Sequence, residues 1–320
     1  AEQCLRALLE KYPAHQRHHN ELAKLKRARD RAHLDQMVGL LESGRKSDDQ
    51  CIFLLYAIAK ELEDLTQWGD AFEYYSRAGK AAASVAKRSG YRVETDIELM
   101  QSVIECCSES WLQLPDPVSS GVEDIESLAK PIFVVGLPRT GTTLVERILS
   151  SHSQIESVDE SFFLPIAIKQ LIADPSTAVT APLTPHDIER ACLLDFTQLA
   201  ERYIDLVRYR LTDRPYFVEK YPFNFLYLGF IAKAFPQARI VYLHRDPMDA
   251  CFAMYKQSYF QFAYELDGLA KYYVAYNQLQ QHWQSVLGDR LVNVQYETLV
   301  QDPESQIPKL LTAMSLDVEP

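Results

Sequence analysis

The segment with the strongest chemical pattern runs from Gly136 to Thr143 and reads Gly-Leu-Pro-Arg-Thr-Gly-Thr-Thr. An apolar run precedes it and a helical pattern follows it, so we expect a loop that joins a strand to a helix. The first N–H groups of a helix have no intrahelical partner and lie at the positive end of the helix dipole, where anions bind. Gly136 and Gly141 permit a tight turn and the close approach of an anion. We therefore predict an anion site on the backbone of residues 140–143.

The spacing of this loop matches a P-loop except at one position. Thr142 follows Gly141 where an ATPase carries lysine. That lysine holds the β- and γ-phosphates, so its loss would cripple a kinase or ATPase. Arg139, inside the loop, supplies a cation instead. The pattern predicts that the backbone anion site is kept and that the residues which act on a nucleoside triphosphate are altered.

The elements that must position this loop follow from the pattern after Pro131. Apolar runs alternate with helical patterns there, which is typical of an α/β domain with a parallel sheet. One helix is expected over Thr142–Ser151, and another over Pro185–Leu211 with Thr184 as its N-cap. Buried strands are expected at Ile132–Val135, Tyr216–Val218, Ile240–Leu243 and Leu291–Val294.

Residues 1–113 read as an α-helical domain. Two neighbouring helices are expected, with Asp70 as the N-cap of the second. Their small and aromatic residues resemble one tetratricopeptide repeat, with Ile58, Ala59 and Leu62 on the first helix and Ala71, Tyr75 and Ala78 on the second. Proline, serine and glycine then mark residues 114–130 as a linker. The α/β domain is expected to cover residues 131–320.

Composition limits the classes of partner. The 320 residues carry 33 basic and 44 acidic side chains, a net charge of −11. This argues against nucleic-acid binding, because DNA affinity comes mainly from Lys and Arg. The basic run Lys24–Arg31 is either a site for an anionic partner or a solvated helix face. No run approaches the ~18 apolar residues of a membrane span.

The cysteines indicate the compartment. Six are present, and only Cys106 and Cys107 are close in sequence. The sequence contains no CxxC, so the cysteines resemble neither a disulfide framework nor a zinc site. We therefore expect a reducing, cytoplasmic environment and no metal.

Pro138–Leu144, Pro-Arg-Thr-Gly-Thr-Thr-Leu, resembles the 5′-phosphosulfate loop of sulfotransferases that use 3′-phosphoadenosine 5′-phosphosulfate (PAPS). The resemblance is greatest to bacterial sulfotransferases fused to tetratricopeptide repeats, which are distant relatives of the protein-tyrosine sulfotransferases. It covers about residues 50–310, and several separated motifs occur in the expected order. It implies a P-loop-type parallel-sheet sulfotransferase domain after a tetratricopeptide-like domain, with PAPS as co-substrate and no metal.

The resemblance also implies catalytic roles. Glu160 matches the carboxylate that acts as general base, with Glu156 and Asp159 as rival carboxylates. A positioned base of this kind typically gains ~10²–10⁴ in rate. Lys220 lies in a segment similar to the family's Lys-x-Pro motif, whose lysine sits over the transferring group. Arg139 and Lys220 are expected to stabilise the departing phosphate and the transferring group.

Donor binding is expected to extend to a second segment. Arg245 matches the arginine that contacts the 3′-phosphate of the donor. A serine usually follows eight residues later, but this sequence has Ala253, and Ser258 or Tyr255 would have to compensate. The segment that begins at Tyr296 resembles a Tyr-Glu-x-Leu motif with a structural role. The family usually continues well beyond this point, so we expect either that the given sequence is truncated at its C-terminus or that donor binding is incomplete.

Several readings of the function stay open at this stage. The acceptor is a hydroxyl on a peptide, a saccharide or a small molecule, with protein tyrosine as the first expectation. The helical domain is a possible site for a protein partner. A P-loop kinase or ATPase is one alternative, and a tetratricopeptide interaction protein with a degenerate nucleotide site is the other.

Overall fold

The computed structural model describes residues 1–44, 47–114, 130–172 and 182–319. It contains two compact units, one of Ala1–Glu94 with Cys251–Tyr273 and the other of Thr95–Ala250 with Val274–Pro320. Most of the expected linker 114–130 lies outside the described residues. The end of the expected helical domain belongs to the second unit, because the boundary between the units falls at residue 94. The division into domains therefore stays a prediction.

In the described residues of the first unit, α1 to α5 precede its boundary, and α4 packs against α5. All six residues predicted to line these two helices are buried. α5 begins at Trp68 with Gln67 as its N-cap, so the prediction of Asp70 as the cap is wrong. Asp70 lies in the first turn, where a carboxylate still stabilises the helix dipole. The helices are α1 (Glu2–Lys11), α2 (Gln16–Leu25), α3 (Ala32–Ser43), α4 (Ile52–Asp64) and α5 (Trp68–Arg88).

The basic run of the first unit makes contacts within that unit. Lys26 pairs with Glu2 at 2.7 Å. Arg31 pairs with Asp35 at 3.2 Å and donates to the side chain of Gln67. Carboxylates thus neutralise Lys26 and Arg31 within the unit, which favours a solvated face over a site for an anionic partner.

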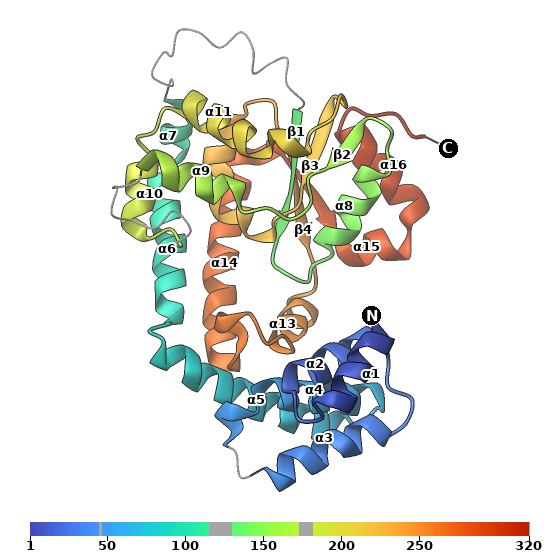
Figure 1. Ribbon diagram of the computed structural model, residues 1–320. Helices are drawn as coiled ribbons and strands as arrows, with labels where there is room; N and C mark the ends of the chain where they lie inside the picture. Colours follow the sequence, from blue (N-terminus) through green and yellow to red (C-terminus); the bar gives the residue numbers. More distant parts are fainter. Residues whose placement is uncertain (45–46, 115–129, 173–181, 320) are drawn as a thin grey trace. The chain divides into compact units, whose positions relative to one another are not determined.

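The second unit is built on a five-stranded sheet with the strand order β2-β3-β1-β4-β5 (Figure 1). Every neighbouring pair is parallel, which confirms the predicted α/β class. Four strands lie where the sequence predicts them, and β2 was missed because three residues are too few to show a period. The strands are β1 (Lys130–Gly136), β2 (Ile155–Ser157), β3 (Tyr216–Glu219), β4 (Arg239–His244) and β5 (Leu291–Gln295).

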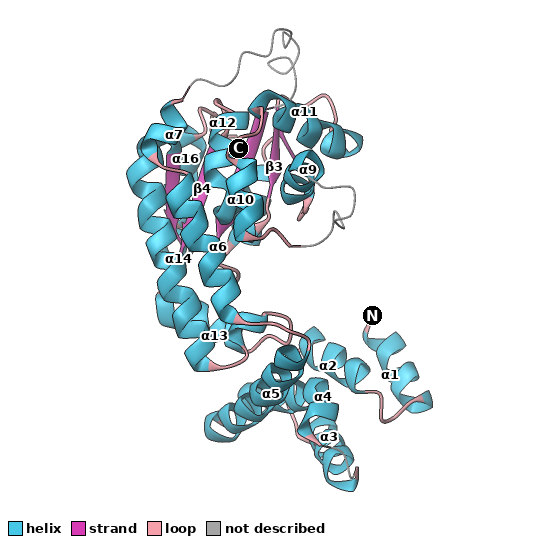
Figure 2. Ribbon diagram, turned by 90° about the vertical axis from the view of Figure 1, so that its left-hand side faces the viewer, coloured by secondary structure: helices cyan, strands magenta, loops and turns pink. Residues whose placement is uncertain are grey.

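Helices cover both faces of this sheet (Figure 2). On one face, aliphatic side chains of β1, β3 and β4 pack against α8 (Thr142–Ser150), α15 (Tyr296–Gln301) and α16 (Pro303–Ala313). On the other face the packing is aromatic: Phe133 of β1 lies 5.8 Å from Tyr203 of α11, measured between ring centres. Both faces are therefore apolar, as a buried parallel sheet requires.

The structure has two helices where the sequence predicts one over Pro185–Leu211, so the prediction of a continuous helix is wrong. Thr184 caps the first, as predicted, and Asp187 completes a capping box. Asp195 then starts a second helix by accepting from the N–H groups of Thr197 and Gln198. These are α10 (Pro185–Ala191) and α11 (Phe196–Val207). The remaining helices are α6 (Val93–Cys106), α7 (Glu109–Gln113), α9 (Phe163–Ile172), α12 (Leu228–Ala234), α13 (Pro247–Tyr255) and α14 (Leu266–Leu287).

Candidate active site

The carboxyl ends of the strands gather the predicted site residues at one edge of the sheet. The anion loop follows β1, Lys220 follows β3 and Arg245 follows β4. Glu160 comes after β2, which pairs with β3. Neighbouring strands lie about 4.8 Å apart, so segments that leave adjacent strands begin close together. The topology thus brings the segments that carry these residues to one edge of the sheet.

The loop backbone has the geometry of an anion cradle. Gly141 caps α8 with a φ of 98°, and Gly136 has a φ of 143°. A Cβ on Gly136 would lie 2.7 Å from the carbonyl oxygen of Leu243, so only glycine fits there. Within the described ranges, the N–H groups of residues 141–143 donate to no backbone carbonyl. These N–H groups are available to an anion at the positive end of the helix.

Some side chains of the loop stabilise its turn, and others are free to contact a ligand. The Thr140 hydroxyl donates to the Leu137 carbonyl oxygen at 2.7 Å and closes the turn. Thr142 is buried, whereas Thr143 and Arg139 are exposed. Arg139 also has a positive φ of 68°, which is uncommon for a residue with a side chain. Among the residues that the structure describes, its guanidinium has neither a hydrogen bond nor an ion pair, so the cation is available to a ligand.

Arg245 is tied to the loop. Its Nη1 donates to the carbonyl oxygen of Arg139 at 2.7 Å. Its guanidinium lies over the Tyr296 ring, 4.7 Å from the ring centre. The Nε–H of Arg245 is buried and has no acceptor in the described part of the chain, which leaves one donor unsatisfied. The structure therefore brings Arg139 and Arg245 together.

The segment after β5 supports both of these residues. A Cβ on Gly141 would lie 2.4 Å from a ring carbon of Tyr296, so the ring packs directly against the loop. Glu297 accepts from the Asp246 N–H at 2.9 Å. Burial works to raise the pKa of Glu297, but hydrogen bonds that include those from Asp246 and Gln295 outweigh it and lower the pKa. Glu297 is thus held ionised beside the start of α13.

Lys220 and Glu160 are in direct contact. The Lys220 Nζ donates to Glu160 Oε2. The Lys220 side chain is only 9% exposed, whereas that of Glu160 is 49% exposed. A buried ammonium needs a partner, and Glu160 supplies one that still faces solvent. The predicted base and the predicted cation therefore form one unit.

The rival carboxylates are placed differently. Glu156 is buried, and its two oxygens accept from the Thr212 N–H at 2.7 and 2.8 Å, so it anchors a loop. Asp159 is exposed and has a φ of 58°, and its backbone carbonyl accepts from the Lys220 N–H at 3.4 Å. Among these three acids, Glu160 is the one whose carboxylate contacts Lys220.

Two features beside this pair were missed in the sequence. Glu219 is fully buried and accepts from the Tyr203 hydroxyl at 2.6 Å and from Ser161. Burial raises the pKa of Glu219 to about 7. Phe162, which is 55% exposed, contacts the Tyr221 ring at a tilt of 57°, with 4.6 Å between ring centres. Their only sequence signal is that they adjoin Glu160 and Lys220.

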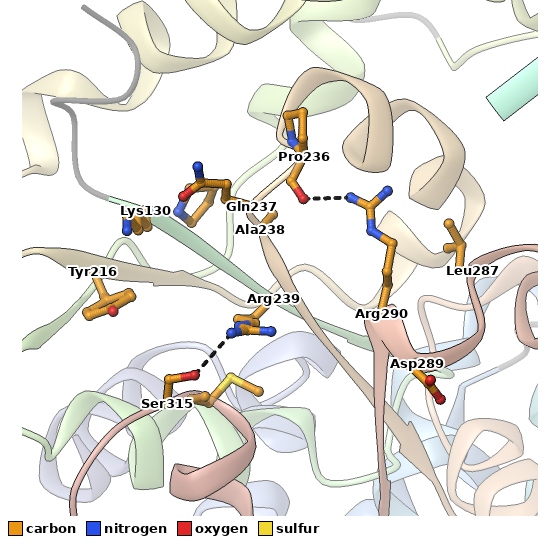
Figure 3. A pocket seen from close by; sticks show the side chains of 12 residues that line it. Lys130, Tyr216, Pro236, Gln237, Ala238, Arg239, Leu287, Asp289, Arg290 and Ser315 are labelled. Atoms are coloured by element: carbon orange, nitrogen blue, oxygen red, sulfur yellow. Dashed lines mark hydrogen bonds between the residues drawn. The ribbon is translucent and has the colours of Figure 1, made fainter. Parts of the chain in front are cut away.

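A cavity of about 440 Å³ lies at the opposite edge of the sheet, beside the first residues of β1, β3 and β4 (Figure 3). Its arginines are engaged within the protein. Arg239 donates to the Ser315 hydroxyl at 3.1 Å. Arg290 donates to the carbonyl oxygens of Ala232 and Pro236 at 3.0 and 3.2 Å. No predicted site residue lines this cavity, so we place the candidate site at the carboxyl edge.

The described ranges contain no group of three or more His, Cys, Asp or Glu side chains that could hold a metal ion. Among the helices that the structure describes, none is long and apolar enough to cross a membrane.

Known proteins resemble parts of this chain. An uncharacterized protein of Aquifex aeolicus is 30% identical over 201 residues, covering 59% of this chain and 26% of that protein. Omega-hydroxy-beta-dihydromenaquinone-9 sulfotransferase Stf3 of Mycobacterium bovis is 24% identical over 245 residues, covering 58% of this chain and 63% of that enzyme. Protein-tyrosine sulfotransferase 1 of Danio rerio is 23% identical over 194 residues, covering 58% and 53%.

The chain therefore spans about a quarter of the first relative and between half and two thirds of the other two. A match to the sulfotransferase family covers residues 131–320, which include every predicted site residue and all of the sheet except Lys130, the first residue of β1. On this match, the chain belongs to the sulfotransferase family.

Proposed function

We propose that this chain transfers a sulfuryl group from PAPS to an acceptor hydroxyl without a metal. Membership of the sulfotransferase family supports sulfuryl transfer in general. The observation that carries the proposal is the pairing of Lys220 with Glu160 at the same sheet edge as a lysine-free anion loop. This edge contains a cradle for an anion, cations for a leaving group and a carboxylate for a proton.

The donor would bind along the loop and the end of β4. The N–H groups of residues 141–143 would hold the 5′-phosphosulfate, with Thr142 and Thr143 adding hydroxyls. Arg139 would neutralise it, since its guanidinium has no partner within the described residues. Arg245 would contact the 3′-phosphate, and its unsatisfied Nε–H is a donor that a phosphate oxygen would pair.

The transfer step follows from the Lys220–Glu160 unit. The acceptor oxygen attacks sulfur, its proton passes to the Glu160 carboxylate, and the bond between sulfur and the bridging oxygen breaks. The electron pair of that bond stays on the 5′-phosphate, where Lys220 and Arg139 neutralise the new charge. An ammonium has three N–H donors, so Lys220 can hold Glu160 and a donor oxygen together. Glu160 is 49% exposed, so water can carry the proton away.

Protein tyrosine is the first acceptor in this proposal. The Danio rerio relative is named for tyrosine, whereas the Mycobacterium bovis relative is named for a hydroxylated menaquinone. Phe162 and Tyr221 offer an aromatic surface next to the proposed base, which suits a ring-bearing acceptor. A saccharide or another small hydroxylated molecule is the alternative. A protein partner would bind the helical first unit, and we propose a cytoplasmic location.

Calorimetry on the full chain tests donor binding with adenosine 3′,5′-bisphosphate as the probe, in one titration with a chelator and in a second with magnesium. We expect the same affinity in both titrations, and we expect R139A to weaken binding by tenfold or more. ATP with magnesium is the comparison, because a kinase or ATPase would bind and turn over that nucleotide. Binding of neither nucleotide would favour an interaction protein with a degenerate site. Radiolabelled PAPS with tyrosine peptides, saccharides and phenols then identifies the acceptor.

A further inference from the structure

The segment that carries Glu160 lies along the end of β3. The Val158 N–H donates to the carbonyl oxygen of Val218 at 3.0 Å and extends the pairing of β2 with β3. The Lys220 N–H donates to the carbonyl oxygen of Asp159 at 3.4 Å. Within the described ranges, the main chain of residues 160 and 161 makes no backbone–backbone hydrogen bond. Side chains must therefore fix the residues that follow Asp159.

Two neighbouring residues of this segment bond to two neighbouring residues at the end of β3. The Glu160 carboxylate accepts from Lys220, and the Ser161 hydroxyl donates to the carboxyl group of Glu219. Ser161 and Glu219 are buried, whereas the Glu160 side chain is half exposed. Water competes for an exposed ion pair, but a hydrogen bond in the interior is stronger and costly to break. The contact between Ser161 and Glu219 is thus the firmer of the two.

Glu219 is itself held from α11. The Tyr203 hydroxyl donates to the second oxygen of its carboxyl group at 2.6 Å. The Tyr203 ring is fully buried and lies 5.3 Å from the Phe235 ring, measured between centres. A buried polar group that loses its partner is costly, so neither hydroxyl leaves Glu219 without a loss of stability. The core beside the sheet therefore sets the position of Ser161.

We propose that Ser161 is a positioning residue for Glu160: its hydrogen bond to Glu219 fixes the main chain beside the proposed base and keeps the Glu160 carboxylate on Lys220. This inference rests on the proposed sulfuryl transfer. Ser161 is buried, so it acts on the reaction through its neighbour. A general base must lie within hydrogen-bond reach of the proton that it removes, and a misplacement of about 1 Å can cost ~10² in rate.

The kinetics of S161A test this role, with the release of adenosine 3′,5′-bisphosphate from PAPS as the assay. We expect kcat to fall by about tenfold to a hundredfold, with an unchanged KM for PAPS because the proposed donor site lies on other segments. In an E160Q background, S161A should cause no further loss, since the group that it positions is gone. A merely structural role would lower kcat by the same factor in both backgrounds. That result, or wild-type kcat in S161A, overturns the proposal.

S151A is the matched control. Ser151 follows α8 in the same unit, is exposed, and donates its hydroxyl to the Ile148 carbonyl oxygen at 2.7 Å. Both substitutions remove one serine hydroxyl that has a hydrogen bond. S151A should keep wild-type kcat. An equal loss in S151A and S161A would assign the effect to a general loosening of the unit and would overturn the proposal.

Urea unfolding separates this inference from the proposed function. E160Q is expected to lower the urea midpoint, because the buried Lys220 loses its carboxylate. If Ser161 holds Glu160 on Lys220, E160Q should shift the midpoint less in S161A protein than in wild type. An equal shift in both backgrounds overturns the proposal, whether or not the protein transfers sulfuryl groups. A smaller shift in a protein that does not turn over PAPS would support this contact and contradict the proposed function alone.

Discussion

The Lys220–Glu160 contact leads to a prediction in which stability and turnover separate. The Lys220 side chain is 9% exposed and that of Glu160 is 49% exposed. E160Q therefore leaves a buried ammonium without its carboxylate, which should lower the free energy of unfolding by about 1–3 kcal/mol. K220M leaves a carboxylate that water can reach, so its stability should stay within about 0.5 kcal/mol of wild type. The double variant should regain most of the stability that E160Q loses.

Turnover should follow a different order. E160Q removes the proposed base and should lower kcat by ~10²–10⁴. K220M removes a cation from the leaving group and should lower kcat by ~10²–10³. The double variant should be no faster than E160Q, although it is more stable. Because the two groups act as one unit, the combined loss should be smaller than the product of the single losses.

The assay follows the release of adenosine 3′,5′-bisphosphate from PAPS, with urea unfolding of the same preparations. E160D is the matched control, since it keeps a carboxylate and should retain more turnover than E160Q. Wild-type kcat in folded E160Q would refute the role of Glu160. A kcat that recovers together with stability in the double variant would show that the pair serves only the fold.

Three further predictions concern the loop, its support and pH. R139A should lower kcat by ~10² or more with an unchanged circular dichroism spectrum, and wild-type turnover would exclude Arg139 from the reaction. G141A should weaken adenosine 3′,5′-bisphosphate binding at least tenfold in calorimetry, because its Cβ would lie 2.4 Å from the Tyr296 ring; unchanged binding would show that this packing does not shape the site. Burial raises the pKa of Glu219 from 4.5 to about 7, so between these pH values the folded state holds a proton that the unfolded chain releases. The free energy of unfolding should therefore fall by up to roughly 3 kcal/mol as the pH rises from 4.5 to 7. E219Q should remove that slope in urea titrations, and an unchanged slope would assign it to other groups.

Some of the fold could be predicted because its signals are local. The apolar run Ile132–Val135 and the glycines that follow it predict a strand, a turn and a helix, and all three are present. β2 could not be predicted in this way, since Ile155–Ser157 is too short to show a period. Asp195 divides a long helical pattern because its side chain competes for the backbone N–H groups of the next turn.

The site was less predictable than the fold for a physical reason. Motif order places Lys220 and Glu160 on separate segments, but only the pairing of β2 with β3 puts them in contact. The same holds for Arg245, whose bond to the Arg139 carbonyl depends on β1 lying beside β4. Contacts between residues far apart in sequence are set by strand order, and strand order is not written in any one motif.

A crystal structure with adenosine 3′,5′-bisphosphate bound would test the central claim most directly. We predict that the 5′-phosphate oxygens accept from the N–H groups of residues 141–143, with Arg139 and Lys220 on the same phosphate and Arg245 on the 3′-phosphate. A nucleotide bound elsewhere, for example in the cavity beside Arg239 and Arg290, would contradict the claim that this loop holds the donor.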